Sequence, residues 1–419
     1  MANDGIVVGL DIGTTKVCAV IGERNENGIL EITGVGLCPS TGMRKGVVVN
    51  IEATLRSVSA AIEAAEMMSG REVHSCWTGI GGSHIDGINS RGVVAVTGKN
   101  RETREIGPED IERVLEAARA VVIPMDRQVL EVIPQSFIVD DQRGIRDPLD
   151  MIGVRLESEV HIITCSVTSA QNLIKCVNRA GFRVNNLILQ SLAAGRSVLT
   201  REEKDMGVAL IDLGGGTTEM LVYSDGAPYS TTTIPAGGAQ VTGDISIIKN
   251  ISLDNAERIK LEAGCCWETL LEGDDDIIVP GVGGRSPLPI PRSQILTIIK
   301  PRMEEIFKMV KEKLDKLTLS RPLGAGIVLT GGGAQMLGAA ELAGNIFKLP
   351  VRVGAPLPLG GLVEEYRSPE YAAAVGLVLE GNDRELAAGA ERGGEKAVRE
   401  KGQGDVFRKL REWLQKEFF

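Results

Sequence analysis

One pattern occurs twice in this chain and constrains its fold more than any other feature. An apolar strand, an aspartate, a glycine-containing turn and a second apolar strand run from Val7 to Val20 and again from Val208 to Val222. The first turn is Asp11-Ile-Gly13-Thr14-Thr15-Lys16 and the second turn is Asp212-Leu-Gly214-Gly215-Gly216-Thr217. The sequence suggests that the second turn is one residue longer. Self-similar segments about 200 residues apart predict a duplicated domain whose two copies face each other.

Length and composition set the outer limits of the interpretation. The chain has 419 residues, 43% of them hydrophobic and 24% charged, which is enough for two or more packed domains. Its net charge of −10 excludes a general nucleic-acid binder. We expect no membrane-spanning helix and no targeting segment at the N-terminus. Seven cysteines without a C-x-x-C pair and three scattered histidines favour a reducing cytoplasm and disfavour a metal cage.

The order of the expected elements divides the chain into an α/β frame with two further units inside it. We expect a first α/β domain from residues 1–83 and 165–195, interrupted by an α+β subdomain at 84–164. A second α/β domain is expected from 196–225 and 303–365, interrupted by a subdomain at 226–302. The remaining segments are expected to be a helix at 366–380 that packs back on the first domain, a flexible linker at 381–404 and an amphipathic helix at 405–419.

The two turns have the chemistry of a phosphate site. A tight hairpin points successive backbone N–H groups into one concavity, which suits phosphate oxygens. Glycine lets the backbone approach closely, threonine hydroxyls add donors and Lys16 adds a positive charge. Asp11 and Asp212 cannot bind phosphate directly but can hold Mg²⁺ through water. One such turn would be a common hairpin, whereas two form a clamp.

Three further segments are candidates for the rest of the site. The first is the apolar strand that ends at Gly331-Gly332-Gly333 with Gln335 beyond it, where bare backbone could lie against a nucleoside. A tight turn between strand and helix is the alternative. The pair Gly237-Gly238 would let backbone approach a ligand, and Glu257 and Lys260 share one helix face that could meet ribose hydroxyls and a base edge. A solvated ion pair is the alternative for these two. No P-loop sequence is present.

These motifs together resemble the superfamily of actin, Hsp70 and the sugar kinases. The resemblance implies an actin-like fold, with two ribonuclease-H-like domains that clamp Mg-ATP between them. Residues 187–195 resemble the first connection between the domains and 368–376 the second. Gln190 stands where relatives orient the attacking water. Because glutamine has no titratable base, we expect a slow ATPase at most, with ATP acting mainly as a conformational ligand.

Within the superfamily, the chain resembles the FtsA family of bacterial cell-division proteins over essentially its whole length. The resemblance rests on the inserted subdomain at 84–164, on the string from Asp147 to Glu157 and on His161-Ile-Ile-Thr164. Asp150 departs from the glycine expected there, which leaves the conformation of its loop open.

This resemblance implies a set of partners. It implies a protein that tethers the tubulin-like ring protein FtsZ to the cytoplasmic face of the membrane at the division site and polymerises head to tail. The acidic C-terminal tail of FtsZ would bind at 226–302, and later division proteins would bind at 84–164. Positive charge that suits an acidic peptide comes from Arg285, Arg292, Lys300 and Arg302. An ordinary solvated face is the alternative for each of them.

The last fifteen residues predict a helix that lies on an anionic membrane surface. Apolar and basic side chains flank each other on it, namely Phe407, Leu410, Trp413, Leu414 and Phe418 with Arg408, Lys409 and Arg411. At about 1.5 Å per residue the helix is too short to span a bilayer. Docking on the protein's own body or on a partner is the alternative.

Two other functions remain open at this point. A sugar or metabolite kinase of the same superfamily would need a catalytic acid and a polar substrate pocket, for which we find no convincing candidate. An actin-like pilus-assembly ATPase is the nearer alternative.

Overall fold

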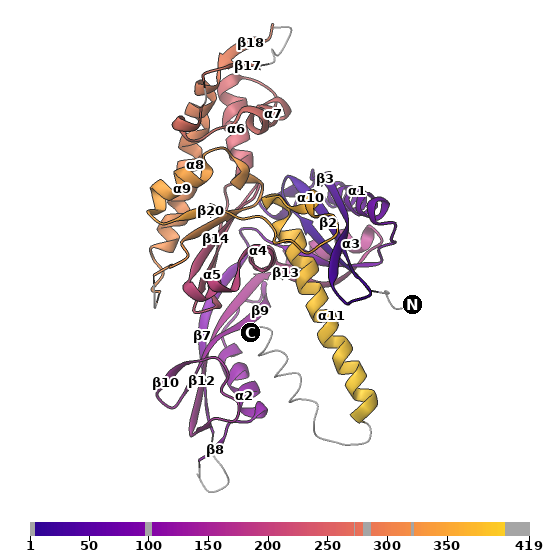
Figure 1. Cartoon of the computed structure of the whole chain (residues 1–419), viewed down its shortest axis with the longest axis vertical. Coiled ribbons are helices and arrows are strands. Elements are labelled where there is room, and N and C mark those ends of the chain that lie inside the picture. The colour runs from indigo at the N-terminus through magenta and orange to yellow at the C-terminus, as the bar shows by residue number, and fades with distance from the viewer. Residues whose placement is uncertain (1–4, 97–102, 272, 280–285, 320–321, 399–419) are drawn as a thin grey trace.

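The computed structural model describes residues 5–96, 103–271, 273–279, 286–319 and 322–398. The inserted subdomain and the tip formed by β17 and β18 lie at opposite ends of the long axis (Figure 1). The first domain lies beside the middle of that axis (Figure 1).

The first domain is built on a five-stranded sheet. The strands β1, β2 and β3 form an antiparallel meander, and β6 and β13 join it in parallel, in the order β13-β6-β1-β2-β3. All seven residues of β1 are buried because the sheet is covered on both faces, by α1 and by α11. Asn50 caps α1 by accepting a hydrogen bond from the Ala53 N–H, and Gly70 ends the helix in the left-handed region. The elements are β1 (Ile6–Ile12), β2 (Lys16–Arg24), β3 (Leu30–Pro39), β4 (Met43–Arg44), β5 (Val47–Val48), α1 (Ile51–Ser69), β6 (Ser75–Ile80), α3 (Val167–Arg179), β13 (Arg183–Leu189) and α4 (Gln190–Val198).

The second domain repeats this topology. Its meander β14-β15-β16 is extended in parallel by β19 and β20, in the order β16-β15-β14-β19-β20. The duplication and the actin-like α/β fold expected from the sequence are thereby confirmed. The elements are α5 (Arg201–Met206), β14 (Val208–Leu213), β15 (Thr218–Ser224), β16 (Ala227–Ile234), β19 (Ile327–Thr330), η2 (Gly332–Gln335), α9 (Ala339–Phe347) and β20 (Val351–Val353). The chain then returns to the first domain, where α10 (Val363–Tyr366) packs on β3, and η3 (Pro369–Tyr371) follows.

The inserted subdomain is a four-stranded antiparallel sheet with one helix packed against it. The sheet has the order β10-β9-β12-β7, and α2 lies against β7 and β12. Asp150 has a φ of +62°, so its loop does adopt the left-handed conformation that favours glycine, which aspartate also tolerates. The elements are β7 (Asp86–Ala95), β8 (Arg104–Glu105), α2 (Pro108–Arg119), β9 (Arg127–Val139), β10 (Gln142–Ile145), β11 (Ile152–Gly153) and β12 (Arg155–Ser166).

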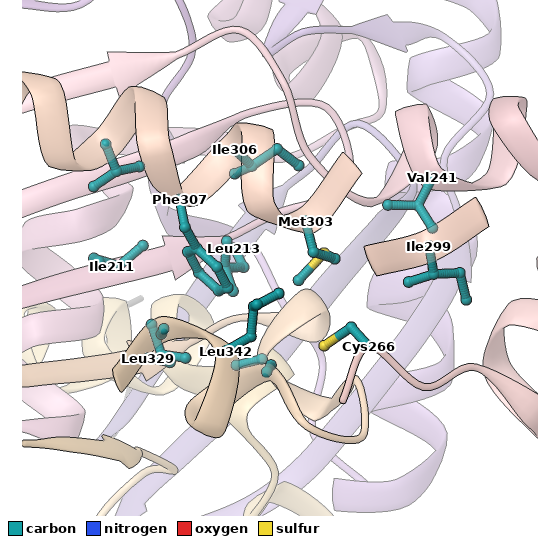
Figure 2. Close-up of a cluster of buried hydrophobic side chains, with 14 of the residues drawn as sticks. Ile211, Leu213, Val241, Cys266, Ile299, Met303, Ile306, Phe307, Leu329 and Leu342 are labelled. Carbon is teal, nitrogen blue, oxygen red and sulfur yellow. The ribbon is translucent and has the colours of Figure 1, made fainter. Parts of the chain in front are cut away.

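The subdomain inserted in the second domain is mainly helical. Its helices share one hydrophobic core with the second sheet, where Phe307 and Met303 of α8 meet Ile211 and Leu213 of β14 (Figure 2). This shared core fixes the subdomain to the sheet that carries the second turn. The elements are α6 (Gly238–Lys249), α7 (Leu253–Ala263), η1 (Glu268–Leu270), β17 (Asp276–Val279), β18 (Leu288–Pro291) and α8 (Arg292–Leu314).

The long helix α11 (Ala372–Val398) corrects one expectation. Its first turns pack on α4 and β1, but the helix does not stop at 380. Most of the segment expected to be a flexible linker, 381–404, is therefore helical. Near its start this segment is tied into the fold by ion pairs: Arg384 contacts Glu380 at 2.7 Å and Glu131 of β9 at 3.0 Å. A count of charges and glycines predicted a tether because such a count does not reveal these partners.

The residues beyond Val398 lie outside the described part of the chain. They include the end of the expected linker and every residue of the expected membrane helix, so the structure does not test either. Among the described residues, no helix is long and apolar enough to cross a membrane.

Candidate functional site

The two turns and the three further candidate segments line a single cavity between the domains. Its volume is about 660 Å³. Every residue expected in the nucleotide site contributes to the lining, namely Asp11, Gly13, Thr14, Thr15, Lys16, Gln190, Asp212, Gly214, Gly215, Gly216, Thr217, Gly237, Gly238, Glu257, Lys260, Gly331, Gly332, Gly333 and Gln335. The fold thus brings together segments more than 300 residues apart in the sequence.

The two turns have the same backbone geometry. The N–H of Gly13 donates to the carbonyl of Lys16 at 2.9 Å, and the N–H of Gly214 donates to that of Thr217 at 3.0 Å. The expectation that the second turn is one residue longer is therefore wrong; Gly215 and Gly216 stand in place of Thr14 and Thr15 and add no residue.

The turns also touch each other across the cavity. A Cβ atom placed on Gly215 would lie 2.4 Å from Thr15 Oγ1, and one placed on Gly216 would lie 2.5 Å from Thr14 Oγ1. The glycines of the second turn therefore make room for the threonines of the first, which pairs the two domains at this point.

Two segments hold the second turn in place. They are the start of α6 and the glycines at 331–333, which form the third glycine cluster beside the two turns. The N–H groups of Gly238 and Ala239 donate to the carbonyls of Gly214 and Gly215 at 2.9 and 2.7 Å. From the other side, Gly331 has a φ of +81°, and a Cβ there would lie 2.2 Å from Asp212 Oδ1. Only glycine fits this position, so the cluster is more than a tight turn between a strand and a helix.

Glu257 and Lys260 do form an ion pair, at 2.7 Å, in which the glutamate is 39% exposed and the lysine is largely buried. The Lys260 side chain is only 12% exposed and its Nζ also donates to Thr242 Oγ1 at 3.1 Å. The pair links α7 to α6 and forms part of the cavity wall. Apolar residues complete this wall, among them Val241, Met303 and Ile306, which also reach the hydrophobic core (Figure 2).

Two aspartates lie near the ends of β1 and β14, beside the turns: Asp11 is buried and Asp212 is partly buried. Burial raises the pKa of Asp11, against the opposing effect of Lys16 and a hydrogen bond from Gln190. Burial and the nearby Asp11 carboxylate raise the pKa of Asp212 to about 7. Such shifts indicate that the site has an excess of buried negative charge that a cation would relieve. Within the described ranges, no three His, Cys, Asp or Glu side chains form a metal cage by themselves.

Glu219 is a third acid that lines the cavity beside the two aspartates, and it is buried. It was not among the site residues predicted from the sequence. It is paired with Asp212 across β14 and β15, and its Oε1 accepts a hydrogen bond from the Gly82 N–H at 3.0 Å. Burial and the charge of Asp212 raise its pKa to about 8. Its Oε2 has no hydrogen-bond partner among the described residues. The sequence could have revealed Glu219, because a hairpin closed by this turn pairs the residue after Thr217-Thr218 with Asp212.

Gln190 is the first residue of α4 and lies in the cavity beside Asp11 and Glu219. Its Nε2 donates to Asp11 Oδ1 at 2.5 Å. Gly81 packs directly against Gln190 and Glu219: a Cβ placed on Gly81 would lie 2.0 Å from Gln190 Oε1 and 2.2 Å from Glu219 Oε1. The amide therefore has a fixed orientation in the part of the cavity that lies between the two turns.

Of the four basic residues expected to meet an acidic partner, the three that the structure describes already have partners within the chain. Arg292 lines the cavity and donates to the Ala263 carbonyl at 3.4 Å. Lys300 is paired with Glu268, and Arg302 with Asp244, both at 2.7 Å. Arg285 lies outside the described residues.

Comparison with protein families identifies two matching regions. Residues 209–376 match the family model described as "Cell division protein FtsA". Residues 82–164 match the model described as "SHS2 domain inserted in FTSA", in agreement with the inserted subdomain of the structure.

Curated relatives match over almost the full length of both chains. Cell division protein FtsA of Borreliella burgdorferi is 46% identical over 99% of each chain. The protein of the same name from Pseudomonas aeruginosa is 43% identical over 99% of this chain and 98% of its own. That of Escherichia coli K12 is 40% identical with the same coverage.

Solved structures with low sequence identity share the fold. The PilM-PilN type IV pilus biogenesis complex aligns with a TM-score of 0.64 at 17% identity, over 90% of this chain and 98% of the other. MreB5 of Spiroplasma citri bound to AMPPNP aligns with a TM-score of 0.55 at 14% identity, over 94% of this chain and all of the other. These likenesses concern the fold alone.

Proposed function

Because the chain belongs to the FtsA family of cell-division proteins, we propose that it is an ATP-responsive adaptor that tethers the FtsZ ring to the cytoplasmic face of the membrane. The observation that carries the proposal is the convergence of both turns and the third glycine cluster on one cavity, in a chain of this family. The pilus-assembly and kinase alternatives do not account for this relationship over the full length.

ATP would bind with its phosphates between the two turns. The backbone N–H groups of both turns, the hydroxyls of Thr14 and Thr15 and the Lys16 ammonium would meet the phosphate oxygens. The ribose and base would lie toward the wall formed by Glu257 and Lys260 and toward the backbone of the glycine cluster at 331–333.

Mg²⁺ would accompany the nucleotide, and the residues present fit it. The pKa values of Asp11 and Asp212 are raised, and Oε2 of Glu219 has no hydrogen-bond partner among the described residues. Both properties fit a group of carboxylates that binds a cation. These acids would hold the ion largely through water and share it with the phosphates. The cation would supply charge neutralisation at the phosphates.

Hydrolysis, if it occurs, would be slow. Gln190 would orient the attacking water but cannot accept its proton. Asp11 and Glu219 are the acids beside this amide, and the pKa of Glu219, raised to about 8, means that Glu219 would hold a proton at neutral pH while no cation is bound. We expect Gln190→Glu to speed phosphate release, and an unchanged rate would remove Gln190 from the mechanism.

Attachment to the membrane would come from residues 405–419, and polymerisation would align copies of the chain head to tail along it. The subdomain at 226–302 would take the acidic FtsZ tail. Because Lys300 and Arg302 already have acidic partners, the peptide would have to exchange with Glu268 and Asp244. The subdomain at 84–164 would take later division proteins.

The test measures both ends of the proposed tether in one experiment. Full-length protein, with MgATP, is mixed with anionic liposomes and a fluorescent peptide of the FtsZ C-terminal tail, and the pellet is analysed. We expect protein and peptide to pellet together. Removal of residues 405–419 should leave both in the supernatant, while peptide binding in solution persists. Pelleting that is unaltered by the truncation, or no peptide binding by the intact chain, would refute the tether.

A further inference from the structure

Lys16, the basic residue of the first turn, is held by the second connection between the domains. Its Nζ donates to the backbone carbonyl of Glu370 and to Glu370 Oε2, the latter at 3.2 Å. The ring of Tyr371 lies beneath the ammonium, 5.3 Å from Nζ to the ring centre. Lys16 and Glu370 both line the cavity between the domains.

Glu370 is fixed in this position by its own neighbours. The Pro369 carbonyl accepts hydrogen bonds from the Gly331 N–H at 3.1 Å and from Thr330 Oγ1 at 3.2 Å. The Tyr371 N–H closes the turn on the Ser368 carbonyl at 3.0 Å. The backbone of the segment is thus bound to the third glycine cluster and to the first turn at once, which holds the Glu370 carbonyl at Lys16 and keeps its carboxylate, 30% exposed, within reach of the ammonium.

We propose that Glu370 is a built-in counter-ion that competes with the phosphates of the nucleotide for Lys16 and thereby lowers the affinity of the site. The proposal rests on the proposed nucleotide site and adds a residue that sets its strength. A triphosphate entering between the turns needs the Lys16 ammonium as a donor. Lys16 must then give up the Glu370 carboxylate, and the loss of this ion pair weakens the binding of the polyanion.

This competition depends on charge, so it distinguishes ligands by their phosphates. The affinity for ATP should be lowered most by Glu370, that for ADP less, and that for adenosine not at all. A residue with a merely structural role in the second connection would affect all three ligands alike.

The variant Glu370→Gln removes the charge and keeps the shape. Its matched control is Glu364→Gln, which makes the same change of charge on α10, where Glu364 is exposed and does not line the cavity. We expect Glu370→Gln to bind MgATP about 5- to 10-fold more tightly than the unaltered chain. The control should leave the dissociation constant unchanged.

A second pair of variants assigns the effect to Lys16. In a Lys16→Gln background, Glu370→Gln should change the affinity for MgATP by less than about 2-fold, because the shared partner is gone. Calorimetric titrations of all variants with MgATP, MgADP and adenosine provide the data, and thermal unfolding confirms that each variant is folded.

The outcomes separate this inference from the proposed function. Tighter MgATP binding by Glu370→Gln, with adenosine unaffected and the effect lost without Lys16, supports the counter-ion. Unchanged or weaker MgATP binding by Glu370→Gln, in a chain whose unaltered form binds MgATP, overturns this inference alone. An unaltered chain that binds no nucleotide overturns the nucleotide site and the counter-ion with it.

Discussion

The first turn and the second turn have the same length and the same closing hydrogen bond and share their aspartate and first glycine, yet the three residues that follow differ. The first carries Thr14, Thr15 and Lys16, whereas the second has two glycines and Thr217 at the matching places. Duplication has therefore kept the backbone and divided the side-chain chemistry. One turn supplies hydroxyls and a positive charge, and the other supplies bare backbone.

The strands that follow the turns differ in the same way. Asp11 is paired across its hairpin with Cys18, whereas Asp212 is paired with Glu219. Both partners are buried, and burial raises the pKa of the Cys18 thiol to about 12, so this thiol stays neutral. The second domain thus has an additional acid that titrates, and the first has none at that place.

Placing a residue of the first turn in the second turn should have the largest effect on stability and on nucleotide binding. Gly216→Thr places a side chain against Thr14, and we expect overpacking to cost about 1–3 kcal/mol of stability and to abolish measurable MgATP binding. Adding Thr14→Gly should recover most of the stability, because the clash is removed. Thermal unfolding and ATP titration give the two readouts. A single variant as stable as the unaltered chain would show that the turns are not in contact.

Replacing Lys16 and the matching Thr217 should show how much each turn contributes to MgATP affinity. Lys16→Gln should weaken MgATP binding by about 30-fold, since hydrogen bonds to charged groups contribute about 1.5–3 kcal/mol. Thr217→Val removes only a neutral donor and should cost about 5-fold. Titration with a fluorescent ATP analogue measures both. Equal losses would contradict the division of chemistry between the turns.

The acid that only the second domain carries should produce a smaller, pH-dependent effect. The pKa values of Asp212 and Glu219 are raised from 3.8 and 4.5 to about 7 and 8, so the fold favours their protonated forms. The contribution of these groups to the stability of the nucleotide-free chain should therefore be full below about pH 4 and be lost progressively as the pH rises to about 7 and 8. Glu219→Gln should flatten the upper part of this decline.

The matched control for this experiment is Cys18→Ala, which alters the equivalent position of the first domain. Its melting temperature should be lower by a similar amount at every pH, because it removes a neutral group. Melting curves between pH 5 and 9 measure both variants. A decline of the same steepness in Glu219→Gln and in the unaltered chain would show that Glu219 does not titrate in this range.

The parts of the site that the sequence predicted are those set by backbone. The turns, the third glycine cluster and the pair at 237–238 could be recognised because glycine is required where chains approach closely. Contacts made by side chains from distant segments could not be recognised. Glu370 depends on the return of the chain to the first turn, and Arg384 on a partner in the inserted subdomain. Glu219 lies next to the second turn and could have been found from the pairing of the hairpin.

The same reason explains the errors in the domain plan. Charges after residue 380 predicted a flexible linker because their partners lie elsewhere in the chain, and the structure shows a helix there. The basic residues at 300 and 302 predicted a positive surface because Glu268 and Asp244 were not known to be their neighbours. Counts of charge along a sequence do not reveal which charges are already paired.

Amide hydrogen exchange of the full chain, measured with and without MgATP, tests the central claim most directly. Nucleotide bound between the turns should protect the amides of residues 11–18 and 212–219 together, since both backbones would donate to the same phosphates. Protection at both segments with one midpoint of ATP concentration is the predicted result. Protection of one turn alone, or of neither, would contradict the account.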